Sequence, residues 1–161
     1  MRNYILIISV ILVDQALKYF VQTRMYLNES ISVVGEFFRI TYIMNKGAAF
    51  GILGDLDARI RIPFFLVVSL LFLGFVFFYF KKILAEGFLA RISFSLIIGG
   101  AVGNLIDRIV FFGGVRDFIE LGINVRYKFA VFNIADAAIS TGVCLLIIHF
   151  MSSSKKEKNV S

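Results

Sequence analysis

Two aspartates in the last third of the chain have the surroundings expected of a catalytic carboxylate pair. Asp117 lies in the segment VRDF at 115–118, and Asp136 ends the segment FNIAD at 132–136, near the start of an apolar run. A carboxylate at membrane depth costs roughly 2.5–3.5 kcal/mol at a helix centre, so a chain that keeps one there usually uses it. We therefore ask what chemistry these two aspartates can perform.

Two carboxylates a few ångströms apart share one proton, because both cannot ionise cheaply. The ionised carboxylate can take a proton from water, and the water then attacks a carbonyl carbon. The protonated carboxyl group can hydrogen-bond the carbonyl oxygen and then help an amine to leave. Asp117 and Asp136 are therefore candidates for an aspartic protease dyad.

Other catalytic chemistries lack suitable residues. His149, the only histidine, lies more than three helical turns beyond Asp136, roughly 20 Å away at the rise of an α-helix. Cys144, the only cysteine, excludes an internal disulfide and a multi-cysteine metal site, and we interpret it as a small buried hydrophobic residue. No serine is well placed to form a dyad with Lys18. We expect no metal and no cofactor.

The composition is that of a membrane protein. Hydrophobic residues make up 59% of the 161 residues, and the mean hydropathy is +0.87. Ordinary soluble domains are about 45–50% apolar. The net charge is +6, but the cations are scattered between apolar segments and form no basic face. Anionic lipid headgroups, rather than nucleic acid, are therefore the expected counterpart.

Four apolar segments have about the 20 residues that a helix needs to cross a bilayer. They are residues 4–21, 62–80, 92–112 and 131–150. The first segment has the positive start of a signal peptide, but no small-x-small cleavage site follows, so we predict a retained helix. These segments predict one membrane-embedded domain, residues 1–161, with an all-α transmembrane part.

The regions outside these segments differ in character. Residues 31–54 are rich in β-branched and aromatic residues, with a turn signal at Gly35-Glu36, and we predict short strands on the outer membrane surface. The polar residues 152–161 are predicted to be disordered. Lys and Arg occur at higher density in 1–3, 81–91 and 151–161 than in the other connections, although the total numbers are similar. This density predicts that both termini are cytoplasmic.

With this orientation, the polar residues of three apolar segments gather near the outer membrane surface. Asp14 and Lys18 are four positions apart on one helix face. The pattern Asn-x-x-Asp occurs at 104–107 and again at 133–136, and GxxxG at 99–103 permits close helix approach.

An ion-paired seam that only fixes helix packing is the alternative explanation. It fits Asp14 with Lys18 and Asp107 with Arg108. It fits Asp136 less well, because no cation lies within four positions of that residue.

These segments together resemble the lipoprotein signal peptidases (signal peptidase II), a family of bacterial membrane aspartyl proteases. The resemblance covers nearly the whole chain, in the family's order. It rests on DQALK at 14–18, NKGAAF at 45–50, GGAVGNLIDR at 99–108, VRDF at 115–118 and FNIAD at 132–136.

The resemblance implies a fold, a reaction and a set of site residues. The implied fold has four transmembrane helices and a small extracytoplasmic β-cradle from the first outer loop. The implied substrate is a diacylglyceryl-modified prolipoprotein, which is cut just before its lipidated cysteine in the bacterial cytoplasmic (inner) membrane. Globomycin inhibits the family, and a monomer is our default expectation. The catalytic aspartates fall on Asp117 and Asp136, and the supporting residues fall on Asp14, Lys18, Asn45, Gly47, Asn104, Asp107, Arg108, Asn133 and Ala135.

The chain departs from the family pattern at two places. The family usually has an apolar residue where this chain has Arg116, and an inward-facing arginine would favour the ionised form of Asp117. The family also often has a proline before the Phe-Asn pair, where this chain reads FAVF at 129–132.

Three other functions stay open on the sequence alone. One is an ion or proton transporter that uses Asp14, Asp107 and Asp136 as a relay, although the inner half of each apolar segment is nonpolar. A second is a presenilin-like protease, whose Gly-x-Gly-Asp signature does not match residues 113–117. The third is a membrane scaffold without catalytic activity.

Overall fold

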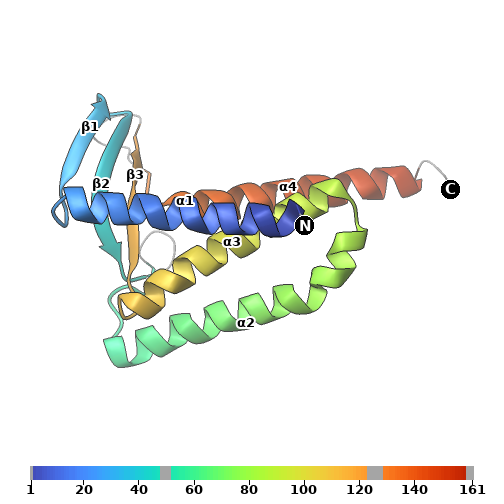
Figure 1. The fold of residues 1–161 in the computed structure, drawn as a ribbon, viewed down its shortest axis with the longest axis horizontal. Helices are drawn as coiled ribbons and strands as arrows, with labels where there is room; N and C mark the ends of the chain where they lie inside the picture. The colour runs from blue at the N-terminus through green and yellow to red at the C-terminus, as the bar shows by residue number, and fades with distance from the viewer. Residues whose placement is uncertain (1, 48–51, 123–128, 159–161) are drawn as a thin grey trace.

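A computed structural model describes residues 2–47, 52–122 and 129–158 of the chain. Its elements are α1 (Arg2–Arg24), β1 (Ser30–Val34), β2 (Phe38–Asn45), α2 (Ala58–Ala85), α3 (Phe88–Val110), β3 (Val115–Leu121) and α4 (Ile134–Lys158). The four helices extend along one direction, and the sheet stands across one end of them (Figure 1). Both termini lie toward the other end.

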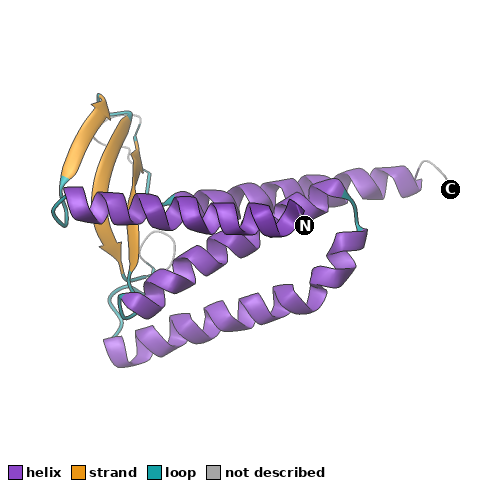
Figure 2. Cartoon of the chain, in the orientation of Figure 1, coloured by secondary structure: helices purple, strands orange, loops and turns teal. Residues whose placement is uncertain are grey.

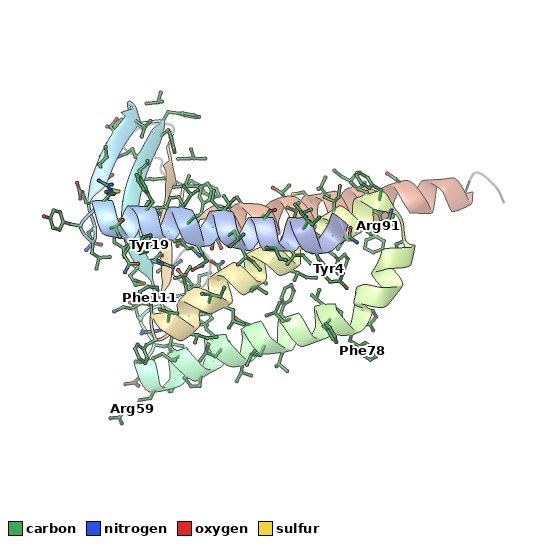
Figure 3. The ribbon with its side chains drawn as sticks, viewed as in Figure 1. Tyr4, Tyr19, Arg59, Phe78, Arg91 and Phe111 are labelled. Carbon is green, nitrogen blue, oxygen red and sulfur yellow. The ribbon has the colours of Figure 1, made fainter. Side chains whose placement is uncertain are left out.

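In the described part of the chain, four helices are long and apolar enough to cross a membrane. Many large apolar side chains project outward from them, as on α2, where Phe77 and Phe78 are each 81% exposed (Figure 3). Such an apolar exterior suits a lipid environment rather than water. The predicted fold class, four membrane-spanning helices with a small sheet, is confirmed.

The sheet includes a strand that lies outside the predicted β-rich loop. It is antiparallel with the order β1-β2-β3, and Figure 2 shows its strands gathered at one end of the helices. The hairpin of β1 and β2 comes from the first outer loop, as predicted, whereas β3 comes from the connection between α3 and α4. Residues 48–51 of the predicted β-rich loop lie outside the described residues.

Two other expectations were wrong in detail. Helix α4 continues to Lys158, so most of the tail predicted to be disordered prolongs the last membrane helix. Residues 159–161 lie outside the described part. Cys144 is exposed on α4 instead of buried, so this face of α4 would contact lipid.

Helix α3 packs against α1 and α4 at glycine positions. A Cβ atom at Gly100 would lie 2.3 Å from the carbonyl oxygen of Ala135 in α4. A Cβ atom at Gly99 would lie 2.8 Å from Cβ of Val10 in α1. These contacts are closer than real Cβ atoms tolerate, so glycine lets the helix backbones approach. They bring the start of α4 against α3.

This close approach makes a stability prediction. Gly100→Ala should lower the apparent unfolding temperature in detergent, because the methyl group would meet rigid backbone and cost about 1–3 kcal/mol. Gly74→Ala is the matched control in α2, where nothing lies within 4 Å of the added Cβ. Equal melting temperatures for the two variants would contradict the close packing of α3 and α4.

Candidate functional site

The two aspartates reach the same cavity from different elements. Asp117 lies in the middle of β3 and is 1% exposed. Asp136 lies in the first turn of α4. Both line a cavity of about 720 Å³ that also touches α2 and α3.

Asn133 connects the two aspartates. Its side-chain nitrogen donates to Oδ1 of Asp117 at 2.6 Å. Its backbone N–H donates to Oδ2 of Asp136 at 3.2 Å, and its side-chain oxygen accepts from the backbone N–H of Asp136 at 2.9 Å. This reciprocal pair is a capping box, in which the residue before the helix and the third helical residue satisfy each other. Asn133 therefore precedes α4. The repeated Asn-x-x-Asp spacing had suggested that Asn133 and Asp136 share one helix face, and this expectation was wrong.

Asp117 is held on its other side by Asn45. The Asn45 side-chain nitrogen donates to Oδ2 of Asp117 at 2.9 Å, and its side-chain oxygen accepts from the backbone N–H of Gly47 at 2.9 Å. Strand β2 sets this contact, because Asp117 pairs with Ile43 in the sheet. The alternation of side chains along a strand then places Asn45 on the same face as Ile43.

Burial raises the pKa of Asp117 to about 7, and the negative charge of Asp136 adds to the rise. The hydrogen bonds from Asn45 and Asn133 and the charge of Lys18 act in the opposite direction. The carboxyl group of Asp117 can therefore hold a proton near neutral pH, whereas an ordinary aspartate is ionised there.

Asp136 is held through Asn104 and Lys18. The Asn104 side-chain nitrogen donates to Oδ1 of Asp136 at 2.7 Å. Its oxygen accepts from the Lys18 ammonium at 3.0 Å and from Asn133 at 3.1 Å. Lys18 also pairs with Asp14 at 2.9 Å, and both side chains are fully buried. The predicted Asp14–Lys18 pair is thus present, and its lysine also contacts an amide that holds Asp136.

Asp14 also fixes the start of α4. Its Oδ1 accepts a hydrogen bond from the backbone N–H of Ala135 at 2.9 Å. The first N–H groups of a helix have no partner within the helix, and a negative charge beside them is favourable. Ala135 is 0% exposed. An added Cβ at Gly103 would lie 2.8 Å from Oδ2 of Asp14 and 3.4 Å from Cβ of Ala135.

Asp107 pairs with Arg116 instead of its neighbour Arg108. The Arg116 guanidinium donates to Oδ1 of Asp107 at 2.8 Å and to Oδ2 at 3.1 Å. Lys18 lies 3.6 Å from the same carboxylate. Arg116 therefore turns away from Asp117, and the concern that an inward-facing arginine would favour ionised Asp117 does not apply.

Arg108 ties several loops together beside the dyad. Its guanidinium donates to the carbonyl oxygens of Gly113 at 3.1 Å and Gly47 at 3.2 Å. It also lies over the ring of Phe65 in α2, 4.4 Å from the ring centroid. One side chain thus connects α3 to α2, to the start of β3 and to the end of β2.

The missing proline before the Phe-Asn pair has a structural substitute. The backbone of Phe132 donates to the carbonyl oxygen of Ile119 at 3.0 Å and accepts from its N–H at 2.8 Å. The segment that leads into α4 is therefore fixed to β3 by hydrogen bonds and does not depend on a rigid residue.

All of the predicted site residues belong to one connected set, although their catalytic and binding roles stay predictions. Three residues that were not predicted also join this set, namely Gln15, Gln22 and Phe65. Gln15 donates to Asp107 at 3.1 Å and to the carbonyl of Gly103 at 3.0 Å. Its place inside the matched segment DQALK was the available signal. Among the described residues, no cluster of His, Cys, Asp and Glu has the geometry to hold a metal ion.

The cavity is lined by residues of α2, α3, α4 and the segments around β3. Its polar lining consists of Asn45, Asn104 and Arg108 beside the two aspartates. The rest of the lining is mostly apolar, with hydroxyl groups on α2 and α4. It comprises Gly47, Phe65, Val68, Ser69, Val115, Phe129, Ala130, Val131, Phe132, Ala137, Ile139, Ser140 and Thr141.

The raised pKa of Asp117 predicts a pH-dependent stability. Its ordinary value is 3.8 and its value in the folded chain is about 7, so the folded state binds the proton more tightly than the unfolded state. Its contribution to stability is therefore fully present below about pH 4 and is lost as the pH rises to about 7. The unfolding temperature in detergent should fall more between about pH 5 and pH 8 for the wild type than for Asp117→Asn. Parallel pH profiles for the two proteins would contradict the raised pKa.

Comparisons with known proteins agree on one family. The family model described as Signal peptidase (SPase) II matches residues 6–152. The lipoprotein signal peptidase of Syntrophus aciditrophicus (strain SB) is 42% identical over 148 residues, which is 92% of this chain and 91% of that protein. The lipoprotein signal peptidase of Halothermothrix orenii is 40% identical over 152 residues, or 94% and 97% of the two chains.

Solved structures of bacterial membrane enzymes share the fold of this chain. A structure described as "Bacterial membrane enzyme structure by the in meso method at 2.3 A resolution" has a TM-score of 0.84 and 33% identity, and the match covers 96% of this chain and 90% of that one. A second such structure, at 1.9 A, has a TM-score of 0.77 and 32% identity, with 92% of each chain covered. The sequence and structural matches extend over nearly the whole chain, and the chain therefore belongs to the lipoprotein signal peptidase (signal peptidase II) family.

Proposed function

We propose that the chain is an aspartic endopeptidase that removes the signal peptide from prolipoproteins, with Asp117 and Asp136 as its catalytic dyad. The observation that carries the dyad is the cavity into which both carboxylates open. Asn133 holds both of them, and no other described pair of acidic residues shares this cavity.

The charges around the cavity favour one shared proton. Four carboxylates, Asp14, Asp107, Asp117 and Asp136, lie with three cations, Lys18, Arg108 and Arg116. One proton on the dyad makes this set neutral, and buried charges are tolerated when they are balanced and hydrogen-bonded. The two aspartates then titrate as a unit, and each apparent pKa belongs to the pair.

This protonation state gives a direct mechanism. The ionised carboxylate takes a proton from a water molecule, and the water oxygen attacks the carbonyl carbon of the scissile bond. The protonated carboxyl group hydrogen-bonds the carbonyl oxygen as negative charge develops there. When the intermediate collapses, a proton passes to the leaving amine. Asn45, Asn104 and Asn133 keep the carboxylates oriented throughout.

The shape of the cavity supports a lipid-modified substrate, a diacylglyceryl prolipoprotein cut before its modified cysteine. The polar lining around the two aspartates suits the peptide backbone at the scissile bond. The apolar wall of Val68 and Ile139, with the hydroxyl groups of Ser69 and Ser140 beside it, suits glyceryl ester groups and their acyl chains. A peptide without the lipid would leave this wall uncovered.

The proposed setting is the bacterial cytoplasmic membrane, with both termini in the cytoplasm and the dyad near the outer surface. In this setting the sheet lies on the outer side, at the end of the helices opposite both termini (Figure 1). A relay transporter is disfavoured, because Asp14 and Asp107 are held in buried ion pairs with Lys18 and Arg116.

Substitution of either dyad residue tests the proposed reaction. Asp117→Asn and Asp136→Asn should each lower cleavage of a purified diacylglyceryl prolipoprotein by at least about a thousandfold, because neither variant can both activate water and supply a proton. Mass spectrometry of the released peptide measures the rate and the cut position. Asp57→Asn is the control, since Asp57 is an exposed residue that caps α2 through the N–H of Arg59. Full cleavage by either dyad variant would refute the dyad.

Arg108 offers a second test of the site. Arg108→Ala should lower cleavage by about tenfold or more and lower the unfolding temperature, because it removes the contacts to Gly47, Gly113 and Phe65. Arg108→Lys keeps the charge but loses the fork-shaped set of donors, so it should recover part of the stability and less of the activity. Wild-type turnover and stability in Arg108→Ala would exclude a role for this residue.

A further inference from the structure

We propose that Arg116 is a positioning residue for Asp117, because it fixes the start of β3 to α1 and α3 and thereby sets where the Asp117 carboxylate enters the cavity. This inference rests on the proposed role of Asp117 in peptide cleavage.

The Arg116 side chain makes contacts in three directions. Its guanidinium donates to both oxygens of Asp107 in α3, at 2.8 and 3.1 Å. In α1 it donates to the side-chain oxygen of Gln22 at 2.8 Å and to that of Gln15 at 3.0 Å. It also lies over the ring of Phe111 just after α3, 4.6 Å from the centroid. The planar guanidinium is suited to such simultaneous contacts, and the lysine ammonium is not.

The backbone of Arg116 is fixed as well. Its N–H donates to Oδ2 of Asp107 at 2.8 Å. Its carbonyl oxygen accepts from the side chain of Asn133 at 3.4 Å, and the same Asn133 nitrogen donates to Asp117. The backbone of Arg116, the residue before Asp117, is therefore held by α3 on one side and by the cap of α4 on the other.

Strand geometry converts this attachment into a position for Asp117. Successive side chains of a strand point to opposite faces, so Arg116 turns toward α1 and α3 while Asp117 turns toward the cavity. Arg116 is 5% exposed, and water offers it no alternative set of partners. A small shift of β3 at Arg116 would move the adjacent carboxylate relative to Asp136, and a misplacement of about 1 Å can cost up to about a hundredfold in rate.

The role is distinct from charge balance alone. Lys18 also lies near Asp107, at 3.6 Å, and balances only one of the two negative charges of Asp14 and Asp107. Any cation at position 116 would therefore balance the other. Only the guanidinium reaches Asp107, Gln15 and Gln22 together. A variant that keeps the positive charge and loses this geometry therefore separates the two roles.

The test uses purified full-length protein in mixed micelles, with a diacylglyceryl prolipoprotein as substrate and rates normalised to folded protein. Arg116→Met should lower kcat by about ten- to a hundredfold and change KM by less than about twofold, because the dyad is misplaced while the cavity remains. Arg116→Lys should recover most of the lost unfolding temperature and little of the lost kcat. Arg24→Met is the matched control. Arg24 also lies over a phenyl ring, that of Phe20, but it is exposed on α1. The kcat of this variant should stay within about twofold of the wild-type value.

Gln22→Met keeps the test decisive if Arg116→Met does not fold. It removes one neutral partner of the guanidinium at the surface of α1 and should lower kcat by about fivefold at unchanged KM, as expected for one hydrogen bond.

Three results would overturn the inference: wild-type kcat in folded Arg116→Met, full recovery of kcat in Arg116→Lys, or an effect confined to KM. Wild-type kcat in Gln22→Met would overturn it when Arg116→Met is unfolded. A wild-type protein that does not cleave the substrate would instead refute the proposed function.

Discussion

The structure depends on the balance of charge among buried side chains at one end of the helices. Asp14, Lys18 and Asp107 are 0% exposed, Asp117 is 1% exposed and Arg116 is 5% exposed. Charges taken out of water are costly unless each has a partner at close range. Asp14, Lys18, Asp107 and Arg116 satisfy this condition among themselves. Arg108 then remains beside Asp117 and Asp136, and the one proton that we propose for this pair would complete the balance.

This balance also builds the fold around the site. Asp14 of α1 accepts from the first turn of α4, Asp107 of α3 holds the start of β3, and Asn133 joins β3 to α4. The glycines of α3 allow the backbones to approach closely enough for these contacts. Since each polar contact also joins two elements, the residues that position the dyad are the same residues that hold the helices together. A substitution among them is therefore expected to change stability and activity at the same time.

The helices were predictable from sequence because an apolar segment of sufficient length has few alternatives in a bilayer. Their ends were less certain, and α4 extends well beyond residue 150, since the polar tail can continue a helix outside the membrane. Strand β3 was not predicted because apolar and polar residues do not alternate regularly along it. Val115, Arg116, Asp117 and Phe118 are all buried, so the strand has no exposed polar face that would produce such an alternation. The sequence placed Asp117 and Asp136 as a pair by elimination. It did not reveal that Asn133 is a helix cap or that Arg116 turns toward α1 and α3, because both depend on contacts between segments far apart in the chain.

We propose that Asp117 and Asp136 together hold one proton before the substrate binds. Infrared difference spectroscopy of the carboxyl groups, comparing the wild type with Asp117→Asn and Asp136→Asn in detergent, measures this most directly. At about pH 6, below the pKa of about 7 for Asp117, we expect a protonated-carboxyl band in the wild type that disappears in Asp117→Asn. A wild-type spectrum without that band, at a pH where the protein cleaves its substrate, would show both aspartates ionised and would refute the shared proton.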